Sequence, residues 1–555
     1  MNERDTVAEI DRLADDYQDF KLRTAPTWAH MIGEYAYADR FEDVSRATED
    51  ALVEEARGFE RRAEAIAEED LDENQRLTRA MVAWEARSRA EMLSGRSAEL
   101  GANPIFGVQA SIGVYLPKLA VPDADVAEAM VGKFAGVATY FHDAAERHRE
   151  GLASGRTPAD FAVRQTVEQL DAWLATPINE DKMLDVQDPP AGVDAARWHE
   201  RLLAVVQKQV RPAVEHYRDV LRDEVAPKAR PDDKCGLTHL PDGDELYAAL
   251  ARFFTTTDRS PEEIHETGLQ QVARLAEEYA ELGPAVVGSD DVTTVLAALR
   301  DDPKLHHTSG DEIVEDSKTA MAKARAVMGD WFGRLPKSDC DVEATTSGAI
   351  AYYFAPPKDG SRGGVFFMNV SDPEGWGRYE IENTAYHEGI PGHHLQLAIA
   401  AELDDVPEFR KRAFIAAYGE GWGLYTERLA DEMGLYSTPM DRMGMLSADS
   451  MRACRLVVDT GMHALGWSRD RAIEYMLENS PMRRGHVTAE IDRYAVTPGQ
   501  ALSNMIGRLE IQRIRRDAED RQGDRFDIKA FHDAVLDSGP MPLGLLDAHV
   551  SARLR

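Results

Sequence analysis

The chain has 555 residues, of which 43% are hydrophobic, and a formal net charge of −35 at pH 7. This is the composition of a globular protein long enough to bury a large core. A field so negative repels nucleic acid and anionic membranes, so we expect neither as a partner. Arginine supplies most of the positive charge and lysine is scarce. This bias favours an acidic, halophilic protein, adapted to high internal salt, over one that recognises a basic substrate.

The N-terminal stretch MNERDTVAEIDRLADDYQDF is polar and acidic, unlike the basic and then apolar stretch of a signal peptide. No apolar run is long enough to predict a transmembrane helix. We therefore expect a cytoplasmic protein. Its three cysteines, Cys235, Cys340 and Cys454, are far apart and form no CxxC pair. This pattern disfavours a disulfide framework and a zinc site built from thiolates.

Residues 1–230 have the periodicity of consecutive helices. In 198–221, apolar residues recur every three or four positions, which predicts a helix with one face in the core and a bend at Pro212. The stretch 225–240, rich in proline, aspartate and lysine, predicts a connector to a second helical part, residues 231–555. We expect the two parts to form one catalytic unit with intertwined elements.

Two more helices, one in each part of the chain, and a small sheet in the second part are also predicted. The segment 41–93 has an apolar helical face, and 261–282 begins after Ser260, a typical N-cap residue. The pattern changes at 347–370, where short runs rich in Tyr, Phe and Val flank the turn-type string PPKDGSRGG. This predicts an antiparallel hairpin. Helical periodicity then resumes near residue 382. The sequence thus predicts a mainly α protein, over half helical, with one small antiparallel sheet.

The segment NTAYHEGIPGHHLQ, residues 383–396, points most clearly to chemistry. Hydrolytic zinc needs neutral imidazoles, a carboxylate ligand and an open position for water, with a general base beside that water. His387 and Glu388 begin the familiar H-E-x-x-H pattern, in which two histidines one helical turn apart bind zinc. Pro391 stands where the second histidine belongs, so this chain departs from that pattern.

The second histidine ligand has two candidates. On an ideal helix, His393 lies about 120° around from His387, whereas His394 returns to the same face about 10 Å further along the axis. Neither suits one zinc ion on a regular helix. Pro391 and Gly392 permit a bulge or break, because proline removes a donor and glycine allows unusual dihedrals. A two-residue bulge makes His393 the second ligand, with His394 as the alternative.

The third ligand is predicted in AYGEGWGLYTE, residues 417–427, where three glycines surround Glu420. Each glycine costs about 1 kcal/mol inside a helix, so the cluster indicates a close backbone approach. Glu420 follows the motif at a distance that allows a turn and an antiparallel return. Glu427 shares its helix face. The alternative is a tightly packed helix with two surface glutamates.

A zinc peptidase also needs a donor for the oxyanion that develops in the transition state. His486 and Tyr494 are the candidates, in a segment that continues into a Pro-Gly turn. The alternative for Tyr494 is a packing role, which is common for a tyrosine before such a turn.

These segments together resemble domain-of-unknown-function family 885, and the resemblance covers essentially the whole chain. It rests on PTWAHMIGEYA at 26–36, YYFAPPKDGSRGGVFFMN at 352–369, HEGIPGHHLQ at 387–396, EGWGLYTERL at 420–429 and RYAVTPGQAL at 493–502. That family is similar to the helical gluzincin zinc peptidases: the thimet oligopeptidase, angiotensin-converting enzyme and thermostable carboxypeptidase groups. The resemblance implies a prolate helical body with a central channel, zinc on the channel floor, and the small sheet beside the zinc motif.

Residue by residue, the gluzincin pattern H-E-x-G-H matches His387-Glu388 and Gly392-His393, with two residues inserted. The resemblance implies that Glu420 is the third ligand and Glu388 the base. It places His486 and Tyr494 opposite the zinc. It also implies that 363–370 is an edge strand that pairs with an extended peptide. Asn504 departs from the pattern, which has an aromatic residue there in many relatives.

We therefore expect a Zn²⁺-dependent metallopeptidase in which His387, His393 and Glu420 bind the metal and short peptides are hydrolysed by activated water. Glu388 is the expected base, and Tyr494 the expected oxyanion donor. Two alternatives remain: a zinc-dependent hydrolase of another amide or ester, and a non-catalytic peptide-binding protein with a degenerate metal site.

Overall fold

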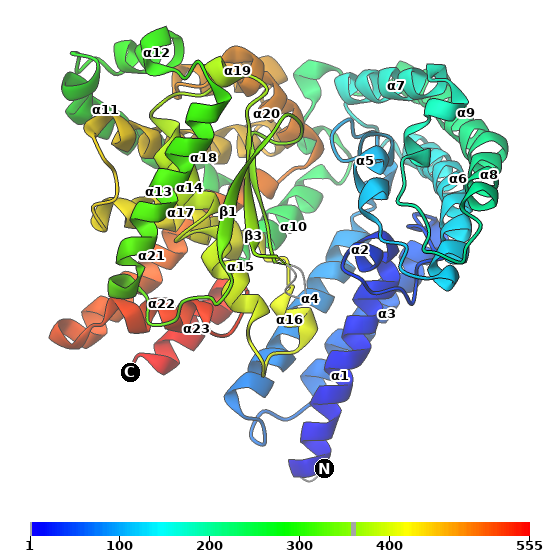
Figure 1. The fold of residues 1–555 in the computed structure, drawn as a ribbon, viewed down its shortest axis with the longest axis horizontal. Helices are drawn as coiled ribbons and strands as arrows, with labels where there is room; N and C mark the ends of the chain where they lie inside the picture. Colours follow the sequence, from blue (N-terminus) through cyan, green and yellow to red (C-terminus); the bar gives the residue numbers. More distant parts are fainter. Residues whose placement is uncertain (1–2, 357–361) are drawn as a thin grey trace. The chain divides into compact units, whose positions relative to one another are not determined.

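The computed structural model describes residues 3–356 and 362–555. Well over half of these residues lie in helices, which Figure 1 colours along the sequence. The prediction of a mainly helical protein is therefore confirmed. The chain folds into two compact units, Met1–Leu246 and Tyr247–Arg555. The division thus falls after the expected boundary at residue 230. No helix in the described ranges is both long and apolar enough to cross a bilayer.

Unit 1, Met1–Leu246, is built of helices. Its α-helices are α1 (Glu3–Thr24), α2 (Pro26–Met31), α3 (Arg46–Ala65), α4 (Glu73–Ser94), α5 (Val108–Tyr115), α6 (Ala124–Ser154), α7 (Asp160–Ala175), α8 (Ala195–Val205) and α9 (Arg211–Val220). The helix predicted over 198–221 is present as α8 and α9, joined through the π-helical turn Val206–Val210. The irregular turn lies directly before Pro212, which has no N–H to donate to the preceding turn.

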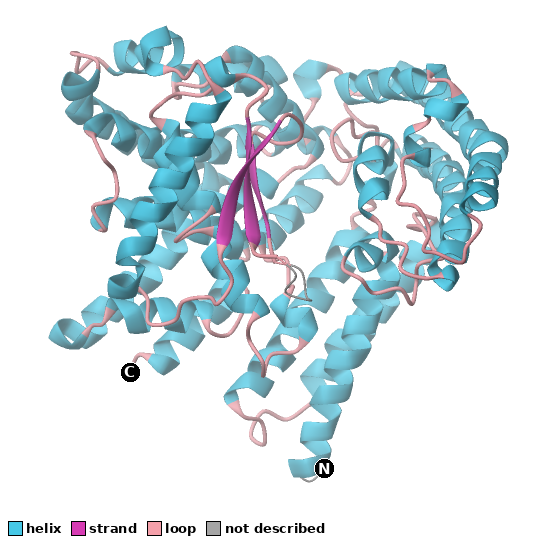
Figure 2. Cartoon of the chain, in the orientation of Figure 1, coloured by secondary structure: helices cyan, strands magenta, loops and turns pink. Residues whose placement is uncertain are grey.

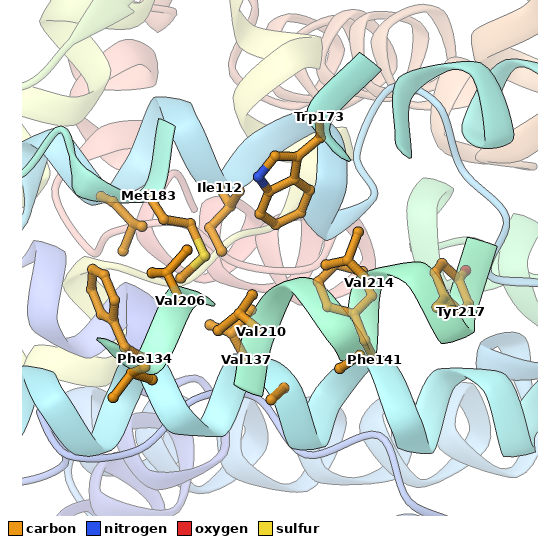
Figure 3. Packing of buried hydrophobic residues seen from close by; sticks show 14 of the residues in the cluster. Ile112, Phe134, Val137, Phe141, Trp173, Met183, Val206, Val210, Val214 and Tyr217 are labelled. Atoms are coloured by element: carbon orange, nitrogen blue, oxygen red, sulfur yellow. The ribbon is translucent and has the colours of Figure 1, made fainter. Parts of the chain in front are cut away.

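The core of unit 1 lies between α6, α7 and α9. Figure 3 shows Phe134, Val137 and Phe141 from one face of α6 directed at the apolar face of α9. The Phe141 ring centroid is 5.4 Å from that of Tyr217 and 5.9 Å from that of Trp173. Each of these side chains is almost completely buried. Burial of one such apolar side chain stabilises the fold by about 1.5–3 kcal/mol.

Unit 2, Tyr247–Arg555, holds the predicted zinc motif. The chain enters it through α10 (Gly243–Thr255) and continues with α11 (Pro261–Val286), α12 (Val292–Asp301), α13 (Gly310–Trp331), α14 (Glu380–Glu388), α15 (His393–Ala401), α16 (Glu408–Lys411), α17 (Ala416–Glu432), α18 (Pro439–His463), α19 (Arg469–Glu478), α20 (Arg484–Val496), α21 (Ser503–Gln522), α22 (Ile528–Leu536) and α23 (Leu543–Arg553). Helix α11 packs along α18, and α17 along α21. The predicted cap of α11 is confirmed, since the Ser260 hydroxyl accepts from the Glu263 N–H.

A single small sheet accompanies these helices in the described residues. Its strands are β1 (Cys340–Thr345), β2 (Ala351–Phe354) and β3 (Gly364–Asn369), in the order β1-β3-β2. Strand β3 pairs antiparallel with β2, as predicted, and parallel with β1. The sheet is therefore mixed rather than a simple antiparallel hairpin. Figure 2 shows the three strands side by side. The predicted turn PPKDGSRGG lies largely outside the described residues.

The expectation that 363–370 is an edge strand is wrong, because β3 has a partner on each side. Its backbone donors and acceptors are used by β1 and β2, so it cannot pair with a peptide as well. The strand that covers this edge, β1, has no clear strand signal in the sequence. The sequence CDVEAT alternates buried and exposed residues and carries two acidic side chains, so it has no continuous apolar run to indicate a strand.

Candidate metal centre

The helix that carries His387 ends one residue later, at Glu388, and the next helix begins at His393. The Ile390–Pro391 peptide bond between them is cis. Gly392 is required by close contact, because a Cβ atom there would lie 1.9 Å from the carbonyl oxygen of His387. The predicted break at Ile390-Pro391-Gly392 is therefore present, and the helix does not continue as a bulged one but ends and restarts.

This break brings His387 and His393 together. Their ring centroids are 4.7 Å apart, and the ring planes are nearly perpendicular. A ligand atom of Glu388 joins them, so that single ligand atoms from His387, Glu388 and His393 all lie within 4.8 Å of one another. His387 is buried, whereas Glu388 and His393 are partly exposed. One end of the cluster is thus held in the core, and the other is accessible.

Glu420, on α17, completes the set. Its Oε2 is 3.9 Å from Nε2 of His387, and its Oε1 is 4.0 Å from Nε2 of His393. The opposite side of α17 is fixed to α21 by glycines. A Cβ atom on Gly421 would lie 2.5 Å from Cα of Gly507, so the two helix backbones touch at this level. The glycines around Glu420 therefore allow the backbones of α17 and α21 to approach closely, as predicted.

Glu427, two turns further along α17, orients the His387 ring. Nδ1 of His387 donates to Oε1 of Glu427 over 2.7 Å, and the Glu427 side chain is fully buried. With its proton on Nδ1, the ring presents the Nε2 lone pair towards Glu420. Burial lowers the pKa of His387 well below its ordinary value, so the ring is neutral. A carboxylate that holds a histidine in this way is the common support of a metal-binding imidazole.

Glu388 and Glu420 have different electrostatic environments. Burial raises the pKa of Glu388 to about 7, against an opposing effect of His393. Burial also acts to raise the pKa of Glu420, but His393 and His387 outweigh it, and the net shift is downward. Glu420 is therefore anionic at neutral pH, as a ligand must be, whereas Glu388 can exchange a proton there. Two carboxylates separated in this way are suited to different roles.

His394 is not part of the cluster. The hydroxyl of Tyr353, on β2, donates to its Nδ1 over 2.9 Å, and its Nε2 donates to the carbonyl of Ser338 over 3.1 Å. Both ring nitrogens are thus engaged, and the ring connects α15 to the sheet. The structure places His393, not His394, beside His387.

Tyr494 reaches the cluster only through other residues. Its hydroxyl donates to Glu490 and accepts from Nε of Arg455, over 2.7 Å in the second case. Nη1 of Arg455 donates to Oδ1 of Asn504 over 3.1 Å, and Nδ2 of Asn504 donates to Oε2 of Glu420 over 2.7 Å. A hydrogen-bonded chain therefore runs from Tyr494 to Glu420. His486 lies on the exposed first turn of α20, outside this chain.

Arg455 and the contacts of Glu427 and Asn504 were not predicted from the sequence. Glu427 had a signal, since it shares a helix face with Glu420. Asn504 was noted only as a departure from the family pattern. In the structure its side chain forms hydrogen bonds with both Glu420 and Arg455. Arg455 occupies an ordinary position in a long helix, and nothing in the local sequence distinguishes it.

The donor set fits zinc. Two imidazoles and one carboxylate are a usual set of protein ligands for a catalytic zinc site, and bond lengths of about 2.0–2.2 Å place ligand atoms roughly 3.3–3.5 Å apart. The observed nitrogen-to-oxygen separations of 3.9 and 4.0 Å are close to this spacing. Gly423 leaves room for the His387 ring, because a Cβ atom there would lie 2.7 Å from its Cε1.

Comparison with known proteins agrees with the whole-chain resemblance. The family model described as "Bacterial protein of unknown function (DUF885)" matches residues 26–550. The crystal structure of a "putative lipoprotein" from Colwellia psychrerythraea has a TM-score of 0.90 and 24% identity, covering 100% of both chains. A second such protein, of unknown function, from Shewanella oneidensis has a TM-score of 0.79 and 18% identity, covering 97% of this chain and 99% of that one. At these identities the likeness establishes the fold. No curated protein matches the chain.

Proposed function

The chain belongs to the DUF885 family of bacterial proteins, and from the geometry of its cluster we propose that it is a zinc metallopeptidase that cleaves short peptides. The observation that carries the proposal is the convergence of His387, His393 and Glu420, with Glu388 beside them. We also propose that the site is similar to a gluzincin centre and that it lies on the floor of a channel.

His387, His393 and Glu420 would hold the zinc ion, which would supply a Lewis acid for the scissile carbonyl and make water acidic enough to ionise near neutral pH. Glu388 acts as the general base: it takes a proton from the attacking water and passes it to the leaving amine. Its pKa of about 7, raised by burial, allows both transfers at neutral pH. Glu420, whose pKa is lowered, stays anionic throughout.

Tyr494 is the proposed donor to the oxyanion, with His486 as the second candidate on the same helix. The Tyr494 hydroxyl donates a hydrogen bond to Glu490. To act in catalysis, it must leave Glu490 and donate to the substrate oxygen instead, while Arg455 keeps the side chain in place. His486, being exposed, has no such contact to release.

The alternatives differ in what they require of the site. A hydrolase of another amide or ester would use the same residues, and a digest of a peptide library distinguishes it. A non-catalytic binding protein would not need a carboxylate that titrates near neutral pH beside the histidines. The position of Glu388 thus favours hydrolysis. A cytoplasmic location stays a prediction.

The test combines metal content and activity. Protein purified without chelator is assayed for zinc by elemental analysis and then incubated with a peptide mixture, with products identified by mass spectrometry. We expect one zinc per chain, and we expect Glu388→Gln to keep the zinc and lose turnover by roughly 10²-fold or more. Glu374→Gln, at an exposed position, is the matched control. Unchanged hydrolysis in Glu388→Gln, or absence of zinc from active protein, would overturn the proposal.

A further inference from the structure

Two arginines one turn apart on α18 face the metal centre, and they differ in how fully they are bonded. Arg455 has its three nitrogens engaged: Nε with the Tyr494 hydroxyl, Nη1 with Asn504, and Nη2 with Glu490 over 2.9 Å. The same Glu490 carboxylate accepts from the Tyr494 hydroxyl. Arg455 is therefore a positioning residue, held by a hydrogen bond at each of its three nitrogens.

Arg452 is bonded far less. Its Nη1 makes a long hydrogen bond of 3.4 Å to the Ala448 carbonyl of its own helix. Its Nη2 lies 3.8 Å from Oε1 of Glu427, which is an ion pair but beyond hydrogen-bond distance. Its Nε is buried and makes no hydrogen bond to any described residue. The side chain is only 14% exposed. A largely buried guanidinium with so few bonds is costly unless something else satisfies it.

The location of Arg452 indicates what that partner is. Oε1 of Glu427, its neighbour, is the atom that accepts from the proposed ligand His387. The guanidinium therefore lies one residue away from the metal centre, close enough for its charge to act on Glu388 and Glu420 as well. A bound peptide lies across such a centre, and its only obligatory anion is the carboxylate at its C-terminus. A guanidinium matches a carboxylate in both charge and shape, with two parallel N–H donors.

We propose that Arg452 binds the C-terminal carboxylate of the substrate, so that the enzyme removes residues from the C-terminal end of peptides. This inference rests on the proposed peptidase function and adds the chain end that is recognised. It assigns Arg452 to substrate binding, separate from the ligands and from Glu388. An internal peptide bond, with no carboxylate near it, would leave the guanidinium unsatisfied and would be a poor substrate.

The experiment pairs two substrates with four enzymes. The substrates are one peptide with a free C-terminal carboxylate and the same peptide with a C-terminal amide. The enzymes are the zinc-loaded wild type, Arg452→Met, and Arg442→Met as a matched control. Arg442 lies on the same helix and is exposed, paired with Asp431. Arg452→Lys, which keeps the charge but not the fork, is a fourth enzyme that guards against misfolding of the methionine variant. Zinc content is measured for each.

We expect the wild type and Arg442→Met to prefer the free acid by roughly 10- to 100-fold in kcat/KM, the range for hydrogen bonds to charged groups. Arg452→Met should lose that preference, through KM, while it keeps its zinc, and Arg452→Lys should keep part of it. Equal cleavage of acid and amide by the wild type would overturn the inference. An equal loss on both substrates, or loss of zinc, would also overturn it, because Arg452 would then only balance the charge of Glu427.

A binding measurement distinguishes failure of the carboxylate site from failure of the peptidase proposal. Calorimetry with the zinc-loaded Glu388→Gln protein compares the two peptides without turnover. If the free acid binds more tightly than the amide, and this preference disappears when Arg452→Met is combined with Glu388→Gln, the result supports the carboxylate site. This holds even where the wild type cleaves no peptide. Equal binding of acid and amide rejects it independently of any activity.

Discussion

Gly423 lies directly against the imidazole of His387. A Cβ atom at position 423 would be 2.7 Å from Cε1 and 2.9 Å from Nε2 of that ring, closer than real Cβ atoms approach any neighbour. The ring cannot move aside freely, because Glu427 holds its Nδ1 from the other side. The absence of a side chain at position 423 therefore determines where Nε2 points.

Gly423→Ala should consequently weaken zinc binding. The added methyl displaces the ring from the direction of Glu420, and we expect the affinity to fall by roughly 10- to 100-fold, as it does when a ligand loses its support. Competition with a coloured chelator measures this. Gly329→Ala is the control: Gly329 is an exposed residue of α13 with nothing within 4 Å of an added Cβ atom. That substitution should leave zinc affinity unchanged and stabilise the fold by about 0.5–1 kcal/mol. Equal zinc affinity in both variants would contradict the assignment of His387.

The two neighbouring histidines should behave differently. His393→Ala removes a proposed ligand, so stoichiometric zinc should be lost. His394→Ala should keep its zinc, because both nitrogens of His394 are engaged with Tyr353 and Ser338. It should instead lower the free energy of unfolding by about 1–3 kcal/mol, because it removes a buried side chain and leaves two partly buried partners without their hydrogen bonds. Elemental analysis and denaturant unfolding check the two halves. Zinc loss confined to His394→Ala would show that the metal lies elsewhere.

The stability of the protein should fall in mild acid, in part because of His148 in unit 1. Burial lowers the pKa of His148 to about 4, while the Glu99 carbonyl opposes the shift. The unfolded chain binds a proton near pH 6.5 and the folded one does not, so the stabilising contribution is complete above pH 6.5 and is lost as the pH falls towards 4. The slope is about 1.4 kcal/mol per pH unit. His148→Gln should show a shallower decline over that interval in calorimetry, and an unchanged decline would refute the assignment.

The parts of the site that could be predicted are those in which local chemistry limits the backbone. Pro391 and Gly392 cannot continue a regular helix, and the chain does break there. The glycines near Glu420 predicted a close helix contact, which Gly421 and Gly507 make. In the same way the helix over 198–221 was clear from its apolar repeat, because its whole face is buried in one core.

The parts that could not be predicted depend on residues brought together from distant segments. Arg452 and Arg455 look like any charged positions of a helix, and only the packing of α18 beside α17, α20 and α21 gives them partners. The same holds for β1, whose pairing with β3 is a long-range contact that its acidic sequence does not indicate. Local patterns determine where an element breaks, but the choice of its neighbours is determined by the whole fold.

The backbone contact between α17 and α21 also affects how the site gains and loses its ion. With no side chain between Gly421 and Gly507, the helix that carries Glu420 has no space to approach α21 further. Asn504, on α21, holds the carboxylate itself by a hydrogen bond of 2.7 Å, so little conformational entropy remains to be lost when the ion arrives. We accordingly expect an apo form that is preorganised, with ion exchange limited by access past the partly exposed Glu388 and His393 rather than by refolding of the ligands.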